Sequence, residues 1–157
     1  MKADQHVEDG QIRAEMTALA IEGRPHFRLS LIELEQESNT YTYQTLERLK
    51  SENPETVYYF IAGADSLFHM TKWARPERIF ADCRVLAAVR DDKTTEDMEA
   101  QIRFLEQQYS AKIHLLQTET MDISSSGIRR KVAAGESIAD MVPEAVRIYI
   151  ERKRLYR

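Results

Sequence analysis

The chain has 157 residues, the size of one ordinary domain, and we expect a single domain over residues 1–157. Apolar residues make up 43% and charged residues 31%, with five glycines and four prolines, which excludes collagen-like, low-complexity and largely disordered chains. The apolar runs are far shorter than the roughly 20 residues that span a bilayer, and the N-terminus is polar. The single cysteine, Cys83, excludes an internal disulfide, so a reducing cytoplasm is the expected compartment.

The net charge of −4 argues against general nucleic-acid binding, but the charge is unevenly distributed. Residues 129–157 hold eight Lys or Arg against four Asp or Glu, whereas residues 1–128 hold fourteen against twenty-two. The C-terminal part is therefore the part that favours anions. From charge alone, two solvated helices with basic faces are the preferred explanation of this pattern, so an anion site has to be argued from spacing.

The spacing of apolar residues predicts helices that alternate with strands. Steps of three and four residues mark the helices, whereas alternation or a continuous apolar run marks the strands. The run VYYFIAGA is typical of a central strand that is covered on both faces. In chain order, we expect a helix over 12–21, a strand over 27–35, a helix over 42–50, a strand over 57–64, helices over 65–70 and 76–81, a strand over 85–89, a helix over 95–109, a strand over 112–116, a helix that Ser124 or Ser125 caps and Gly135 ends, and a last helix over 143–154.

This order of elements predicts an α/β fold, a Rossmann-like and mostly parallel sheet with helices on both faces. Such sheets bind ligands beyond the carboxyl ends of their strands. The segments to inspect are therefore Gly63 to Asp65, Arg90 to Asp92 and Ser124 to Ser126.

Two of these segments suit a nucleotide. Gly63 permits close approach of the backbone, and Asp65 can accept hydrogen bonds from ribose hydroxyls, although a helix-capping role explains Asp65 equally well. The run Ser124 to Ser126, with Arg129 one turn later, combines hydroxyls, backbone amides and a guanidinium that suit a phosphate. A plain serine cap beside exposed arginines is the equally weighted alternative.

Other candidates are weaker. Trp73, the only tryptophan, lies in a polar connection where it either stacks on a flat ring or packs a loop on the core. The four histidines show no ligand spacing, and neither a glycine-rich dinucleotide fingerprint nor a Walker A loop is present in the sequence. We expect no metal site formed by the protein and no covalent catalysis.

Four segments together resemble the bacterial nicotinate-nucleotide adenylyltransferases, members of the nucleotidyltransferase superfamily. They are TYTYQTLERLK, YYFIAGADSLFHMTKW, VLAAVR and ISSSGIRRKVAAGESIADMVPEAVRIYIERKRLY, in the family's order and at compatible spacing. The resemblance covers nearly the whole chain. Its most specific parts are GAD after the strand, the tryptophan eight residues after Asp65, and the ISSSxIR box.

The resemblance implies transfer of the adenylyl group of ATP to nicotinate mononucleotide, giving deamido-NAD and pyrophosphate with the help of Mg²⁺. It implies that ATP and the mononucleotide are the partners, without nucleic acid or membrane, and it leaves a homo-oligomer open. By the same resemblance, ATP is bound by Ser124, Ser125, Ser126, Arg129, Gly63 and Asp65, and the acceptor is bound by Tyr41, Thr42, Trp73, Arg90 and Lys2.

The sequence departs from the family in one respect. The family motif GGTFDPxHxGH, whose histidines hold the reacting phosphates, does not occur in these residues. We therefore assign no catalytic residue, expect that a first strand, helix and strand of the domain are missing before Met1, and expect little or no transfer by this chain alone. A non-catalytic nucleotide-binding or interaction module, and a related nucleotidyltransferase with another acceptor, are the alternatives.

Overall fold

The computed structural model places the helices and strands of the chain in two compact units. Unit 1 consists of Met1–Glu37 and Met121–Arg157, and unit 2 consists of Ser38–Thr120. The prediction of one domain over 1–157 stays a prediction. The structure describes residues 7–35, 40–89, 95–118 and 123–157, and only the backbone of Ala64, Asp65 and Thr95.

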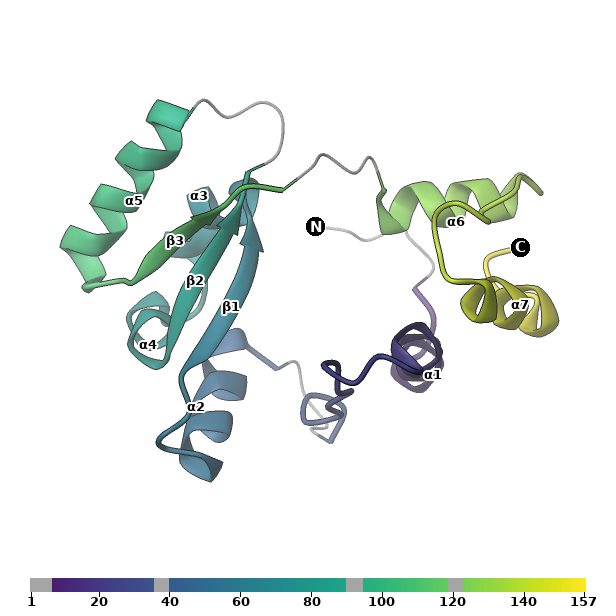
Figure 1. The fold of residues 1–157 in the computed structure, drawn as a ribbon, viewed down its shortest axis with the longest axis horizontal. Helices are drawn as coiled ribbons and strands as arrows, with labels where there is room; N and C mark the ends of the chain where they lie inside the picture. Colours follow the sequence, from purple (N-terminus) through teal and green to yellow (C-terminus); the bar gives the residue numbers. More distant parts are fainter. Residues whose placement is uncertain (1–6, 36–39, 90–94, 119–122) are drawn as a thin grey trace. The chain divides into compact units, whose positions relative to one another are not determined.

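Helices outnumber strands in both units (Figure 1). Most predicted elements are present, with bounds shifted by a few residues. In chain order they are α1 (Gly10–Ile21), α2 (Thr42–Glu52), β1 (Tyr58–Gly63), α3 (Ala64–His69), the 3₁₀ helix η1 (Met70–Lys72), α4 (Pro76–Asp82), β2 (Cys83–Ala88), α5 (Thr95–Tyr109), β3 (Ile113–Leu116), α6 (Ser125–Ala133) and α7 (Glu144–Lys153).

Unit 2 is built on a parallel sheet with the strand order β1-β2-β3 (Figure 1). Phe60 lies opposite Val85, which in turn lies opposite Ile113. The helices that connect the strands flank the sheet, as parallel connections require. The predicted α/β class with a parallel sheet is therefore confirmed.

The core of unit 2 lies on one face of this sheet. Ala62, Val85 and Ala87 point to that face and are at most 4% exposed, because α3, α4 and α5 pack there. On the other face Tyr59 is 50% and Ile61 67% exposed. Among the described strands β2 is central and β1 is at the end of the order, which differs from the prediction for VYYFIAGA. An apolar run indicates burial but does not identify the neighbouring strand.

The predicted strand over 27–35 is wrong. Residues 27–31 have no regular secondary structure and 32–35 form turns, with Leu34 N donating to Leu31 O at 2.8 Å. Phe27 is 61% exposed and Leu31 is 41% exposed. A strand needs a hydrogen-bonded neighbour, and no described strand pairs with this segment. Alternation of apolar residues alone does not supply that neighbour.

Unit 1 contains α1, α6 and α7 around a small second core. Val146 and Ile150 of α7 are buried in it, and apolar residues of α1 and α6 pack against them. The Tyr149 hydroxyl donates to Glu15 and so ties α7 to α1. Within the described residues, no helix has the length and apolar character needed to cross a membrane.

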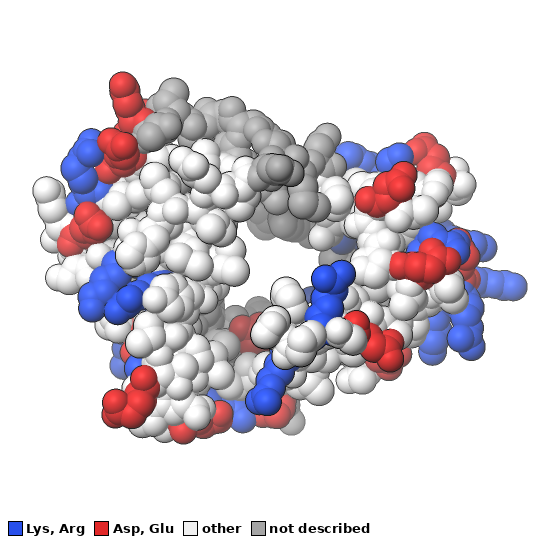
Figure 2. Space-filling view, in the orientation of Figure 1, with Lys and Arg blue, Asp and Glu red and all other residues white. Residues whose placement is uncertain are grey.

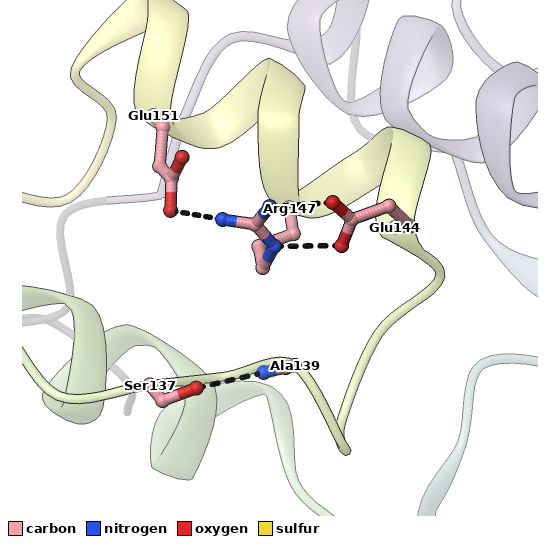
Figure 3. A network of polar contacts seen from close by, with 5 residues as sticks. All are labelled: Ser137, Ala139, Glu144, Arg147 and Glu151. Atoms are coloured by element: carbon pink, nitrogen blue, oxygen red, sulfur yellow. Dashed lines mark hydrogen bonds and ion pairs between the residues drawn. The ribbon is translucent and has the colours of Figure 1, made fainter.

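Arg147 of α7 bonds to two carboxylates of the same helix, on the side toward Ser137 and Ala139 (Figure 3). Its Nε donates to a Glu144 carboxylate oxygen at 2.7 Å, and its other nitrogens donate to Glu144 and Glu151. The hydrogen bond from Arg147 lowers the pKa of Glu144, and the bonds to both carboxylates raise the pKa of Arg147. These i,i+3 and i,i+4 pairs support the helix that carries the unit 1 core.

Candidate functional site

The serine run of the sequence forms the start of α6. Ser124 is the N-cap, and its Oγ accepts a hydrogen bond from Gly127 N at 3.1 Å and lies 3.3 Å from Ser126 Oγ. Ser124 and Ser125 are exposed and Ser126 is partly exposed. The first α-helical bond runs from Ile128 N to Ser124 O, so the amides before it are oriented outward at the positive end of the helix dipole. This arrangement can accept an anion.

A pocket of about 340 Å³ opens beside this helix start, within unit 1. Ser125 and Arg129 contribute polar groups to it, whereas most of the lining is apolar. The apolar part comes from Met16 and Ala20 of α1, Ile128 of α6, and Val142, Val146 and Ile150 on or just before α7. The structure thus brings two sequence-predicted residues, Ser125 and Arg129, to the rim of one cavity.

Sequence reasoning missed the other polar residues of this pocket, which are Arg13, Thr17 and Tyr156. Burial raises the pKa of Tyr156, Glu8 raises it further, and the charges of Arg129 and Arg13 lower it. The two guanidinium groups therefore act on the same phenol. The positive charge of residues 129–157 was a signal for Arg129, but the neighbourhood of Arg13 is created only by folding. Figure 2 shows that Lys and Arg also gather over α7, with acidic residues among them.

Gly63 and Asp65 lie at the carboxyl end of β1, in unit 2. Gly63 is the last residue of the strand and the N-cap of α3, and a Cβ added there would meet nothing within 4 Å. The backbone of Gly63 has φ −72°, so its conformation does not require glycine. Open space at the end of a parallel strand is what the prediction for a ligand requires. Asp65 is in the first turn of α3, but its side chain lies outside the described part.

Tyr41 and Thr42 lie at the start of α2. Tyr41 is the N-cap, and its amide donates to Gln44 Oε1 at 3.0 Å, so that Gln44 caps the helix. The Tyr41 ring is 53% exposed and stacks on Tyr43 with the ring centroids 6.1 Å apart. The amides of Gln44 and Thr45 donate to Tyr41 O at 2.9 and 3.3 Å, so the amides of Thr42 and Tyr43 before them are the ones that suit a carboxylate.

Trp73 follows the 3₁₀ helix η1. Its ring lies edge to face with Phe60, with centroids 5.8 Å apart and planes at 89°. Trp73 is partly buried and packs against the core of unit 2. The alternative in which Trp73 packs on the core is therefore confirmed, and its stacking on a flat ring stays a prediction.

The remaining predicted residues, Arg90 and Lys2, lie outside the described residues. The described part contains no group of three or more His, Cys, Asp or Glu side chains that could hold a metal ion. Cys83 is buried, and burial followed by the charge of Asp82 raises its pKa to about 11. A thiol of this kind is a poor nucleophile at neutral pH.

Comparisons with family models and with curated proteins agree with one another. The model of the cytidylyltransferase-like family matches residues 1–131. The probable nicotinate-nucleotide adenylyltransferase of Lachnoclostridium phytofermentans is 44% identical over 144 residues, which is 92% of this chain and 72% of that protein. The protein of the same name from Clostridium kluyveri is 34% identical over 99% of this chain and 78% of its own length.

A solved structure has the same fold. The Plasmodium falciparum nicotinic acid mononucleotide adenylyltransferase complexed with NaAD is similar with a TM-score of 0.73 and 21% identity. The similarity covers 99% of this chain and 78% of that one. Agreement over nearly the whole chain supports the architecture of both units.

Proposed function

Because this chain belongs to the cytidylyltransferase-like family, as a relative of the nicotinate-nucleotide adenylyltransferases, we propose that it transfers the adenylyl group of ATP to nicotinate mononucleotide. The products are deamido-NAD and pyrophosphate, and the reaction belongs to NAD biosynthesis in the cytoplasm. The observation that carries the proposal is the exposed serine cap of α6 with Arg129 at the adjoining pocket.

In this proposal the phosphates of ATP bind at the start of α6. The hydroxyls of Ser125 and Ser126 and the amides of the first turn donate to phosphate oxygens, and Arg129 adds a charged, forked donor. Ser124 contributes mainly by capping, because its Oγ already accepts from Gly127 N. Gly63 and Asp65 are assigned to ATP by the family resemblance, with Asp65 accepting a hydrogen bond from the ribose.

The acceptor is assigned to unit 2 and to residues outside the described part. Trp73 stacks on the pyridine ring, the amides at Tyr41 and Thr42 receive the carboxylate, and Arg90 and Lys2 lie near the mononucleotide. An oxygen of the acceptor phosphate bonds to the α-phosphorus of ATP while the bond from that phosphorus to the pyrophosphate oxygen breaks. The protein accelerates this step by orienting both phosphates and by stabilising charge.

Mg²⁺ is assigned to ATP rather than to a protein cage. Magnesium in such sites is held by one or two carboxylates, waters and substrate phosphates. The described residues contain no ready cluster of ligands for it, so no protein ligand is named. When bound, the ion neutralises phosphate charge.

The test is a binding titration followed by a pyrophosphate assay on the 157-residue chain. We expect ATP and nicotinate mononucleotide to bind, and deamido-NAD and pyrophosphate to form slowly and in equal amounts. Nicotinamide mononucleotide and phosphopantetheine replace the acceptor as controls, and faster turnover with either would change the assigned acceptor. Ser126→Ala and Arg129→Gln should weaken ATP binding by roughly tenfold, the loss of one charge-assisted hydrogen bond.

The second candidate is the alternative that the sequence left open, a chain that binds both nucleotides without transferring the adenylyl group. Binding of both ligands without release of pyrophosphate would select this alternative. Failure of both ligands to bind would overturn both functions.

A further inference from the structure

The backbone that leads into Trp73 is firmly anchored. Trp73 N donates to Met70 O at 3.1 Å and closes the turn of η1. Met70 and, one turn earlier, Leu67 are 0% exposed in the core of unit 2. Gln101 of α5 donates to Leu67 O at 3.4 Å and holds the same segment from a second side. The position of the Trp73 Cα is therefore fixed by the core, and the direction of the indole depends on the side-chain contacts.

The Phe60 ring contacts the Trp73 indole. The two rings are perpendicular, at 89°, with centroids 5.8 Å apart, which is a favourable edge-to-face arrangement. Phe60 is in the middle of β1, three residues before Gly63, and is held by its register with Val85 of β2. A perpendicular neighbour covers at most one face of the indole, and Trp73 as a whole is only partly buried.

We propose that Phe60 is a positioning residue for the acceptor. It holds the Trp73 indole in the orientation in which the indole stacks on the N-substituted pyridinium ring of a mononucleotide. The inference rests on the proposed function, in which Trp73 contacts the acceptor. A pyridinium ring is flat and positively charged, and tryptophan is the side chain whose face attracts such a ring most strongly. Phe60 acts through Trp73 and does not itself touch the ligand.

The experiment uses Trp73 as its own reporter, because it is the only tryptophan of the chain. Nicotinate mononucleotide is titrated into the protein while tryptophan fluorescence and, separately, the heat of binding are recorded. Phe60→Leu removes the ring but keeps apolar bulk, and Phe60→Tyr restores the ring. Phe104→Leu is the matched control, since Phe104 of α5 is 49% exposed.

We expect nicotinate mononucleotide to quench Trp73 in the wild type and in Phe104→Leu. In Phe60→Leu the Kd for the mononucleotide should rise roughly three- to tenfold, the equivalent of one aromatic contact, and quenching at saturation should fall. Phe60→Tyr should restore both values to within about twofold, while the Kd for ATP stays unchanged in every variant.

The outcomes separate this inference from the proposed function. No heat of binding for nicotinate mononucleotide in the wild type would overturn the proposed function and the inference with it. Binding heat without a change of Trp73 fluorescence in the wild type would overturn the inference and the assignment of Trp73 to the acceptor, but not the proposed adenylyl transfer. This measurement does not depend on any variant. Phe60→Leu that binds and quenches like Phe104→Leu would also overturn it.

Discussion

Burial of the Cys83 thiol couples the stability of unit 2 to alkaline pH. Burial raises its pKa to about 11 in the folded protein, so between about pH 9 and pH 11 the unfolded chain ionises first. The neutral thiol therefore makes its full contribution to the free energy of unfolding below about pH 9. This contribution, of order 2 kcal/mol, is lost as the pH rises to about 11. Urea unfolding at pH 8 and pH 10.5 measures it. Cys83→Ala should lose less stability over this range, and equal losses would contradict the prediction.

Gly127 is a second residue whose substitution is limited by a close neighbour, the hydroxyl of Ser124. A Cβ at this position would lie 3.0 Å from Ser124 Oγ, which already accepts from Gly127 N. We expect Gly127→Ala to displace the Ser124 hydroxyl and to weaken ATP binding several-fold. The gain in helix propensity, up to about 1 kcal/mol, should offset the strain, so the melting temperature changes little. Unchanged ATP affinity in a calorimetric titration would show that the serine cap tolerates the methyl group.

At the scale of the helix, α6 ends in a Schellman motif that requires a left-handed residue. Gly135 has φ +73° and donates to Val132 O at 3.0 Å, while Glu136 N donates to Lys131 O at 2.8 Å. Gly135→Ala should lower the free energy of unfolding by about 1 kcal/mol, because alanine is strained in this conformation. Asn tolerates it better, so Gly135→Asn should lose clearly less. Thermal melts compare the two variants, and equal losses would exclude strain as the cause.

At the scale of the whole molecule, the structure predicts a specific order of hydrogen exchange. Amides of β2 should exchange slowest in unit 2, since the strand is paired on both sides and Val85 and Ala87 are 0% exposed. Amides of 27–31 should exchange within the fastest class, because no described strand pairs with them. Exchange followed by mass spectrometry of peptides decides both points. Protection of 27–31 comparable to that of β2 would restore the predicted strand.

Local patterns predicted most of the fold. The helix caps are the clearest case, because Ser124, Pro143 and Gly135 mark the limits of α6 and α7 within a residue or two. The pairing of strands was harder to predict from the sequence. Phe27, Leu29 and Leu31 alternate as a strand would, yet they are exposed, because a strand depends on a neighbour that the segment itself does not encode. For the same reason, the composition of β1 did not reveal that β1 is an edge strand of the described sheet.

The candidate site was predicted in its local parts only. The serine cap was readable because capping and anion binding depend on a few consecutive residues. The sequence did not predict that Phe60 and Arg13 belong to the site, because their contacts are with residues more than ten positions away in the chain. The side chain of Asp65 and the residues Arg90 and Lys2 stay predictions.

The outer side of β1 has a practical consequence for handling the protein. In the described part this strand is an edge strand, and its own residues Tyr59 and Ile61 are open to solvent. The unpaired edge of a sheet can add strands from neighbouring molecules, and this leads to aggregation. Concentrated stocks should therefore become turbid on storage well before dilute ones, and a lysine in place of Ile61 should delay the onset of light scattering.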